Sequence, residues 1–318
     1  MSAIAWIKSL EWHQQLAFLI GIGATGSAGW TVYKLLRRRG KKRNLADLVI
    51  CITGATGGLG RALAETLRER RVARIILTGR NREALQQLIA HLQLIGDVLA
   101  APVVIEMDLL ELDTLPGKAR DILAVYGRID VLIHNAGISC RGGVMDTDFA
   151  VDLQVMKTNY LAPVLLTKGL LPSMVERGGG CIVAVSSIQG RLAIPFRAAY
   201  AASKHSLQAF FDCLRAELWD ANVDIVVVSP GYIKTGLSLR ALRGKGNAHG
   251  KMDEATANGM EARQVAERIV RAIEDREREV LMCGLLPRLA LILRSSFPSL
   301  YFGQMAKRAK QLKHLERA

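Results

Sequence analysis

The sequence predicts an α/β protein in which a doubly wound, parallel sheet of seven strands is preceded by one transmembrane helix. Three observations support this prediction. From Leu48 onward, short apolar runs alternate with amphipathic stretches, which is the pattern of a parallel sheet covered by helices. A glycine-rich turn directly follows the first apolar run, at residues 54–60. Near the N-terminus, residues 16–33 contain no charged side chain, and a segment of this length can span a bilayer.

The flanks of this uncharged segment are also typical of a membrane helix. Trp12 precedes it, Trp30 lies near its end, and the basic run RRRGKKR follows. A cleaved signal peptide is the alternative, but the basic residues come after the apolar segment, and only Lys8 precedes it. The match to G-x-G-x-x-G at residues 21–26 is interpreted as packing between membrane helices, because no strand precedes it.

The formal net charge of +14 is concentrated in two short stretches. Each adjoins an apolar segment, and a basic stripe with interleaved aromatic residues, as a nucleic-acid face would need, is absent. We therefore expect a membrane surface, and no nucleic acid, as a partner. The first stretch consists of Arg37, Arg38, Arg39, Lys41, Lys42 and Arg43, and the second contains Arg288, Arg294, Lys307, Arg308, Lys310, Lys313 and Arg317.

The first basic stretch also predicts the membrane topology. Positive residues flanking a membrane helix remain on the cytoplasmic side, so the α/β domain is expected in the cytosol. We expect a single-pass protein of the endoplasmic reticulum membrane. The peroxisomal membrane and a lumenal domain are the alternatives.

The five cysteines are odd in number and widely spaced. They form neither a C-x-x-C pair nor a zinc-ligand pattern, so we predict buried, reduced thiols, no disulfide framework and no metal site. The cysteines are Cys51, Cys140, Cys181, Cys213 and Cys283.

The alternating pattern places the elements of the domain in order. Strands are expected near residues 48–53, 73–78, 102–107, 129–134, 180–186, 223–229 and 279–283. Helices are expected near residues 58–70, 81–95, 113–126, 149–176, 199–221 and 261–275. The long irregular stretch 231–260 is predicted to be a functional lid.

The pattern divides the chain into three parts. Residues 1–43 are the membrane anchor and the basic residues that follow it, residues 44–284 are the α/β domain, and residues 285–318 are a tail. The tail is dense in apolar residues, but Pro287 and Pro298 interrupt it. We expect it to lie at the membrane interface without spanning the bilayer. A buried contact in a homodimer is the alternative.

The glycine-rich turn has the context of a phosphate-binding site. It follows a strand and opens a helix, so its glycines let the backbone approach a pyrophosphate, and the helix N-terminus supplies amide donors. The candidate cofactor-binding residues here are Thr53, Gly54, Thr56, Gly58, Leu59 and Gly60.

From this turn to about residue 284, the chain resembles the short-chain dehydrogenase/reductase superfamily, which implies a Rossmann-type fold and a nicotinamide cofactor. The resemblance is carried by Asp108-Leu109, Asn135-Ala136-Gly137, Asn159, Ser187, Tyr200-x-x-x-Lys204 and Pro230-Gly231-x-Ile233-x-Thr235. It implies that catalysis involves Asn159, Ser187, Tyr200 and Lys204. It also implies that the cofactor is bound by Asp108, Asn135, Ala136, Gly137, Tyr200, Lys204, Pro230, Gly231, Ile233 and Thr235.

The Tyr200 and Lys204 pair has a physical rationale of its own. A separation of four residues places both side chains on one face of a helix. A phenol titrates near pH 10, and a nearby ammonium lowers that pKa, so Tyr200 can exchange a proton with a carbonyl or alcohol oxygen. Ser187 is expected to hydrogen-bond the same oxygen, and Lys204 to hold the nicotinamide ribose. The resemblance implies that Asn159 maintains a water-linked proton path to Lys204.

Two positions bear on the cofactor. His134 replaces an asparagine that is usual in the superfamily, and we expect it to keep a structural hydrogen bond. After the second predicted strand there is no acid for a ribose 2′-hydroxyl, whereas Arg80 is placed to meet a 2′-phosphate. We therefore expect NADP(H) in preference to NAD.

The stretches MDTD, SSIQG, IPFRAAYAASKHSLQAFFDCLRAE and SPGYI are similar to the dehydrogenase/reductase member 7B branch of the superfamily. That similarity implies a membrane-attached oxidoreductase associated with reduction of acyl- or alkyl-dihydroxyacetone phosphate. The expected function is therefore NADP-dependent interconversion of a carbonyl and an alcohol on a lipid-like substrate. A steroid or retinoid dehydrogenase, as in the 11-beta-hydroxysteroid dehydrogenase branch, and a non-catalytic membrane scaffold are the alternatives. The basic residues of the predicted lid favour an anionic head group; they are Lys234, Arg240, Arg243, Lys245 and Lys251.

Overall fold

The computed structural model describes residues 42–95 and 100–317, and its compact α/β unit begins at Arg43. The unit contains a seven-stranded sheet in the order β11-β7-β6-β4-β1-β2-β3, with every neighbouring pair parallel. The strands are β1 (Val49–Ile52), β2 (Arg74–Gly79), β3 (Val103–Glu106), β4 (Val131–His134), β6 (Gly180–Val185), β7 (Val223–Pro230) and β11 (Glu279–Met282). The predicted Rossmann-type sheet of seven strands is therefore confirmed.

The central strands consist almost entirely of buried apolar residues because helices cover both faces of the sheet. Ile52 at the end of β1 lies between Leu77 of β2 and Ile133 of β4. The strand order therefore changes direction at β1, since β2 and β3 lie on one side and β4 on the other. In an open parallel sheet, ligands bind at the carboxyl ends of the strands beside such a point.

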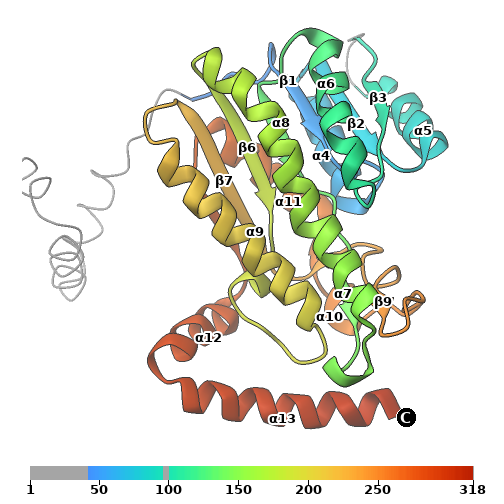
Figure 1. The fold of residues 1–318 in the computed structure, drawn as a ribbon, viewed down its shortest axis with the longest axis vertical. Helices are drawn as coiled ribbons and strands as arrows, with labels where there is room; N and C mark the ends of the chain where they lie inside the picture. Colours follow the sequence, from blue (N-terminus) through green and yellow to red (C-terminus); the bar gives the residue numbers. More distant parts are fainter. Residues whose placement is uncertain (1–41, 96–99, 318) are drawn as a thin grey trace, which may run out of the picture. The chain divides into compact units, whose positions relative to one another are not determined.

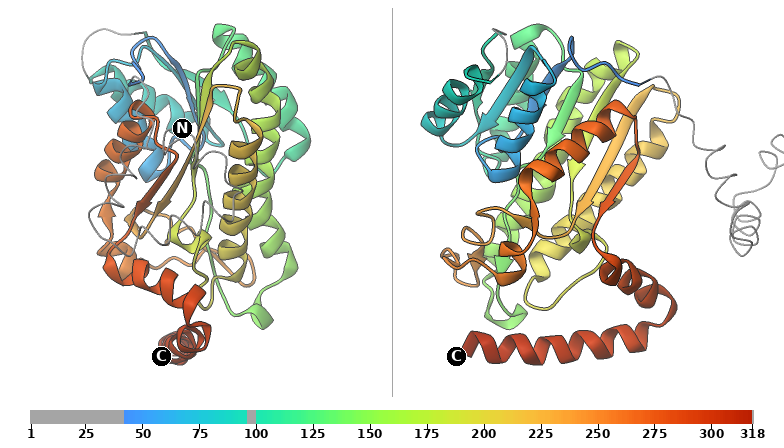
Figure 2. Two further views of the ribbon diagram at one scale, coloured as in Figure 1. Left: turned by 90° about the vertical axis from the view of Figure 1, so that its left-hand side faces the viewer. Right: turned by 180° about the vertical axis from the view of Figure 1, so that it is seen from behind.

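Three helices pack on each face of the sheet, which gives the three layers seen edge-on in Figure 2. One face is covered by α4 (Gly58–Glu69), α5 (Arg82–Gln93) and α11 (Ala262–Glu274). The other face is covered by α6 (Leu115–Tyr126), α8 (Ala162–Glu176) and α9 (Ala198–Glu217) (Figure 1). All six lie within a few residues of the predicted ranges, except that α8 is only part of a longer predicted helix.

The helix predicted at residues 149–176 is not uniform. It consists of α7 (Phe149–Met156), a π-helical turn η3 (Lys157–Leu161) and α8. Pro163 has no N–H to donate to the carbonyl of Asn159 four residues earlier, which interrupts the α-helical hydrogen bonds at this turn. Single π-turns within helices occur frequently at functional sites.

The predicted lid, residues 231–260, is irregular apart from short elements that fasten it to the domain. These are β8 (Ile233–Lys234), β9 (Leu242–Arg243) and α10 (Glu254–Ala257), with β10 (Met260–Glu261) at its end. β10 pairs with β8, and β9 pairs with β5 (Cys140–Arg141), which follows β4. The lid is therefore tied to the segment that leaves the middle of the sheet.

The tail forms two helices, α12 (Leu285–Ser296) and α13 (Pro298–Arg317). The predicted interruption at Pro298 corresponds to the break between the two helices, because α12 ends at Ser296 and Pro298 opens α13. Pro287 lies in the first turn of α12, where a missing N–H costs little. In Figure 1, α13 crosses the end of the unit toward which the strands run. Tyr301 is buried there, and its hydroxyl donates to the carbonyl of Ala193 at 2.9 Å.

Among the residues that the structure describes, no helix is both long and apolar enough to cross a bilayer. The transmembrane helix predicted at 16–33 lies outside those residues.

The five cysteines are free thiols, but they are not all buried as predicted. Burial raises the pKa of Cys51 to about 12 and that of Cys181 to about 11, and Cys140 is also buried. Cys283 is half-buried. Cys213 is exposed because it lies on the solvent side of α9, so the prediction was wrong for this residue.

Candidate active site

A cavity of about 620 Å³ lies at the carboxyl ends of the strands. Its lining comes from the loops after β1, β2, β3, β4, β6 and β7, from α9, and from the lid and the two tail helices. The cavity is therefore located where the strand order predicts a ligand site.

The turn after β1 requires glycine at several positions. Gly54 has φ +64°, and a Cβ there would lie 2.8 Å from Ala136 Cα. A Cβ on Gly60 would lie 2.3 Å from the carbonyl oxygen of Gly54, and one on Gly58 would lie 2.9 Å from Thr235 Cγ2. The glycines thus let the turn close on itself and let the segments after β4 and β7 approach it.

Two side chains join the ends of β1 and β4. Thr53 Oγ1 accepts hydrogen bonds from the backbone N–H groups of Asn135 and Ala136, each at 3.1 Å. Asn135 Nδ2 in turn donates to the carbonyl oxygens of Thr53 at 3.0 Å and Gly54 at 3.1 Å. These bonds fix the shape of the glycine-rich turn.

The turn suits the pyrophosphate of a dinucleotide. α4 begins at Gly58 on the cavity, and its N-cap, Gly57, has no side chain that could cap the helix, so the first amides can face an anion. At the end of β2, Arg80 is exposed and lines the cavity. Asp108 lines it as well, and its Oδ1 accepts from Leu110 N at 3.0 Å.

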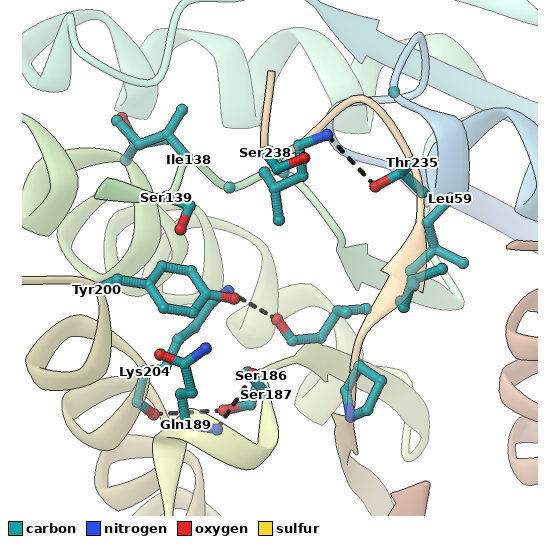
Figure 3. A pocket seen from close by; sticks show the side chains of 18 of the residues that line it. Leu59, Ile138, Ser139, Ser186, Ser187, Gln189, Tyr200, Lys204, Thr235 and Ser238 are labelled. Atoms are coloured by element: carbon teal, nitrogen blue, oxygen red, sulfur yellow. Dashed lines mark hydrogen bonds between the residues drawn. The ribbon is translucent and has the colours of Figure 1, made fainter. Parts of the chain in front are cut away.

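Tyr200 and Lys204 lie on the cavity face of α9, as their spacing predicts, and both are buried. Lys204 Nζ donates to the carbonyl oxygen of Val185 at 2.9 Å and lies 5.9 Å from the centroid of the Tyr200 ring (Figure 3). Ser187 follows β6 on the same cavity, and its Oγ accepts from Gln189 N at 3.1 Å.

The pKa of Tyr200 shifts in the direction opposite to the one predicted from the nearby Lys204. Burial raises the pKa of Tyr200, which outweighs the opposing effects of a hydrogen bond with Ser187 and of the charges of Arg197 and Arg141. Burial also lowers the pKa of Lys204 to about 8. Without a bound nucleotide or substrate, the expected lowering of the Tyr200 pKa by Lys204 is therefore wrong, because desolvation has the largest effect on the pKa of both groups.

Asn159 lies in the π-helical turn and holds the segment after β4. Its Oδ1 accepts from Ile138 N, and its Nδ2 donates to Ile138 O and to Ser203 Oγ, each at 2.9 Å. A Cβ on Gly137 would lie 3.2 Å from Asn159 Oδ1 and 3.5 Å from Lys204 Nζ. The two side chains therefore converge on Gly137, and the proton path through Asn159 stays a prediction.

His134 has the structural role expected of it. Its Nε2 is hydrogen-bonded to Thr167 Oγ1 at 2.9 Å in the buried interior. Burial, with a smaller contribution from the charge of Lys204, lowers the pKa of His134 to about 3, so its imidazole is neutral. Within residues 42–95 and 100–317, no group of three His, Cys, Asp or Glu side chains is arranged to hold a metal ion.

Almost all of the predicted site residues line this one cavity. They are Gly54, Thr56, Gly58, Leu59, Gly60, Arg80, Asp108, Asn135, Ala136, Gly137, Ser187, Tyr200, Lys204, Pro230, Gly231, Ile233 and Thr235. Thr53 and Asn159 lie directly behind the lining, where they hold the backbone that forms it.

The basic residues predicted to recognise the substrate were largely the wrong ones. Of the five lid residues named above, only Arg240 lines the cavity. Lys234 pairs with Glu261 at 3.0 Å, and Lys245 pairs with Asp148 at 2.7 Å.

Sequence reasoning missed two other arginines of the lining, Arg141 and Arg197. It also missed the contribution of the tail: Leu286, Pro287, Ala290, Tyr301, Met305 and Arg308. The only available signal was the position of Arg141 and Arg197 close to the motif residues Gly137 and Tyr200.

Comparisons with known proteins identify the family of this chain. The family model for short chain dehydrogenases matches residues 48–244. The chain is 46% identical over 295 residues to dehydrogenase/reductase SDR family member 7B of Xenopus tropicalis, covering 92% of this chain and 95% of the relative. The protein of the same name in Mus musculus is 45% identical over 285 residues, covering 89% and 87%.

Solved structures give the same fold. A short chain dehydrogenase/reductase from Burkholderia phymatum in complex with NAD has a TM-score of 0.72 at 22% identity, covering 81% of this chain and 96% of that chain. A metagenomic short-chain oxidoreductase in complex with NADP has a TM-score of 0.62 at 26% identity, covering 76% and 98%.

These relatives match most of the chain, and the Tyr200 and Lys204 pair faces a cavity whose glycine-rich turn suits a dinucleotide. The chain therefore belongs to the short-chain dehydrogenase/reductase family, is similar to its member 7B proteins along most of its length, and is an oxidoreductase.

Proposed function

We propose that this oxidoreductase uses NADP(H) to interconvert a carbonyl and an alcohol on an anionic, lipid-like substrate, with acyl- or alkyl-dihydroxyacetone phosphate as the first candidate. The observation that carries the proposal is the mixed lining of the cavity outside the nucleotide-binding turns. Its basic residues are Arg141, Arg197, Arg240 and Arg308, and its apolar residues include Leu192, Ile194, Leu237, Leu242, Leu286 and Met305. Arginines suit an anionic head group, and the apolar side chains suit a hydrocarbon chain.

The residues at the centre of the cavity have distinct roles in this proposal. When bound, the nicotinamide supplies or accepts a hydride at the substrate carbon. During reduction, the Tyr200 hydroxyl gives its proton to the substrate oxygen, and during oxidation Tyr200 takes a proton from that oxygen. Ser187 hydrogen-bonds the same oxygen. Lys204, held by the Val185 carbonyl, is the cation behind the phenol and the candidate contact for the nicotinamide ribose.

A matched panel of ketones tests this function. Purified full-length protein with NADPH is given acyl-dihydroxyacetone phosphate, its uncharged dephosphorylated counterpart, a ketosteroid and a retinal. We expect the highest kcat/KM with the phosphorylated ketone. A higher kcat/KM with the steroid or the retinal would replace the proposed substrate class with the neutral one.

The preference for NADP(H) depends on Arg80. In the native protein we expect kcat/KM to be higher with NADPH than with NADH, because Arg80 forms charge-assisted hydrogen bonds with the 2′-phosphate. Arg80→Asp replaces attraction with repulsion, so the ratio of the two efficiencies should fall by at least about tenfold. Steady-state kinetics with both nucleotides measure it.

Arg120→Asp is the matched control, since it makes the same change of charge at an exposed residue of α6 outside the cavity. Its nucleotide preference should equal that of the native protein. Equal efficiency of the native protein with the two nucleotides would contradict the role of Arg80.

We further infer that the protein is a single-pass protein of the endoplasmic reticulum membrane, with the α/β unit in the cytosol. The basic stretch after residues 16–33 supports this topology, because positive residues stay on the cytoplasmic side. The exposed apolar side chains of the tail support its contact with the same bilayer; they include Leu285, Leu286, Leu289, Ile292, Phe297, Leu300 and Phe302.

Protease treatment of sealed microsomes tests the topology. With a short tag after Ala318, we expect added protease to remove the tag without detergent, because the α/β unit faces the outside of the vesicles. A tag that is digested only after detergent is added would place the domain in the lumen.

A further inference from the structure

Arg141 and Arg197 meet on a single carboxylate next to the catalytic tyrosine. Arg141 Nε and Nη2 both donate to Asp253 Oδ2, the former at 3.2 Å. Arg197 Nη2 donates to the same oxygen at 3.3 Å. Arg141, Arg197 and Tyr200 line the same cavity, and Cys140, which precedes Arg141 in β5, packs with Tyr200.

The cluster carries one net positive charge in a partly buried environment. The side chains of Arg141, Arg197 and Asp253 are only 9%, 13% and 19% exposed. His249 Nε2 lies 3.5 Å from Asp253 Oδ1, but burial lowers its pKa, so at neutral pH it adds no charge. Two guanidinium groups are therefore balanced by one carboxylate, and a positive charge held away from water favours an anionic ligand.

Neighbouring residues hold Arg141, and a strained backbone position precedes Arg197. Arg141 belongs to β5, which pairs with β9 of the lid, and its Nη1 donates to Ser139 Oγ at 2.6 Å and to Cys140 O at 2.8 Å. Ser139 and Tyr200 line the same cavity (Figure 3). Arg197 follows Phe196, which has φ +62°. An aromatic residue in the left-handed region is rare, and such local strain is concentrated at functional sites.

We propose that Arg141 and Arg197 form the subsite that binds the anionic group of the substrate, and that Asp253 of the lid holds the two guanidinium groups in place for it. This inference rests on the proposed function and names the residues that would select a charged ketone over an uncharged one. Arg141 and Arg197 are specificity-determining residues in this proposal, and Asp253 is a positioning residue.

The test compares two ketones that differ only in charge, acyl-dihydroxyacetone phosphate and acyl-dihydroxyacetone, in full-length protein with NADPH. For Arg141→Gln and for Arg197→Gln, we expect kcat/KM for the charged ketone to fall by about tenfold to a hundredfold, since a charge-assisted hydrogen bond is lost. The value for the uncharged ketone should change by less than about threefold. Arg141→Lys, which keeps the charge without the planar fork, should restore part of the discrimination.

The opposite change of charge gives a second readout. Asp253→Asn removes the one negative charge of the cluster but keeps an amide oxygen that can accept from the guanidinium groups, so they stay in place. The ratio of kcat/KM for the charged ketone to that for the uncharged ketone should therefore rise several-fold. If the three residues merely fasten the lid, all of these variants should lower turnover of both ketones equally. That result would overturn the subsite.

Lys245→Gln is the matched control, because it removes a positive charge from the lid at an exposed residue paired with Asp148 and outside the cavity. It should leave the ratio unchanged. Calorimetric binding of decyl phosphate and of decanol separates this proposal from the proposed function. If neither ketone is reduced, but decyl phosphate binds in preference to decanol and Arg141→Gln abolishes that preference, the function fails and the subsite stands. Equal binding of both probes by the native protein would overturn the subsite.

Discussion

Tyr200→Phe is expected to reduce turnover by at least about a hundredfold while leaving NADPH affinity nearly unchanged. The substitution removes only the hydroxyl, and a positioned proton donor or acceptor contributes a factor of this size or more to the rate. The ring is buried and packs with Cys140 and Ala199, so the remaining phenyl group keeps the cavity wall intact. Single-turnover rates of ketone reduction by NADPH, together with nucleotide binding followed by NADPH fluorescence, measure both properties.

The protonation state of Tyr200 is consistent with this expectation. Because desolvation raises the pKa of Tyr200, the phenol keeps its proton at neutral pH and has a proton to give during carbonyl reduction. Tyr126→Phe is the matched control. Tyr126, at the end of α6, packs against the hydrophobic core between the sheet and α6, α8 and α9, and it lies outside the cavity. It should retain normal turnover. Retention of more than about a tenth of native activity in Tyr200→Phe, with melting temperature unchanged, would contradict proton transfer by Tyr200.

The parts of the site that the sequence predicts correctly are those fixed by local structure. The glycines at 54–60 follow a strand and open a helix, so their position at the edge of the sheet follows from the chain order alone. Tyr200 and Lys204 share a face of α9 because of helical periodicity. Likewise, each loop that follows a parallel strand reaches the same edge of the sheet, which places Asn135 and Thr235 beside the turn.

The parts of the site that the sequence does not predict depend on contacts between residues far apart in the chain. Arg141 and Asp253 are 112 positions apart and meet only because the lid pairs β9 with β5. No periodicity in either segment indicates this pairing, since each strand has only two residues. Consequently the charge of the lid could be counted from the sequence, but the side chains that face the cavity could not be identified.

The π-helical turn at Lys157–Leu161 was also not predicted. Pro163, which explains it, is visible in the sequence, but the segments on both sides have helical character, so residues 149–176 were predicted as one helix. In the tail, Pro298 marks the break between α12 and α13, whereas Pro287 lies in the first turn of α12 and interrupts no helix. A proline ends one helix or begins another, and composition alone does not distinguish the two cases.

Gly60→Ala is expected to weaken NADPH binding by more than about tenfold and to lower the melting temperature. The added Cβ would lie 2.3 Å from the carbonyl oxygen of Gly54, 2.8 Å from Asn135 Nδ2 and 2.9 Å from Ala55 Cα. Two of these atoms belong to the backbone, so the turn itself must move. Forcing a methyl group into a packed site costs about 1–3 kcal/mol.

The movement would reach the cofactor-binding surface directly. Asn135 Nδ2 donates to the carbonyl oxygens of Thr53 and Gly54, and a shift of Gly54 or of the amide would break the bonds that join β1 to β4. The amides at the start of α4 would then be displaced from the pyrophosphate position. Nucleotide affinity should therefore fall further than the loss of stability alone explains, and isothermal calorimetry beside thermal unfolding separates the two effects.

Gly117→Ala is the matched control for this substitution. Gly117 lies in the first turn of α6, and the nearest atom to an added Cβ is the flexible end of the Arg120 side chain at 3.7 Å. Alanine favours a helix over glycine by about 0.5–1 kcal/mol, so this variant should unfold at the same or a higher temperature and bind NADPH normally. If Gly60→Ala behaved like Gly117→Ala in both measurements, the close approach of the glycine-rich turn to the segment after β4 would not be needed for nucleotide binding. The role assigned to Gly54, Gly60 and Asn135 would then be wrong.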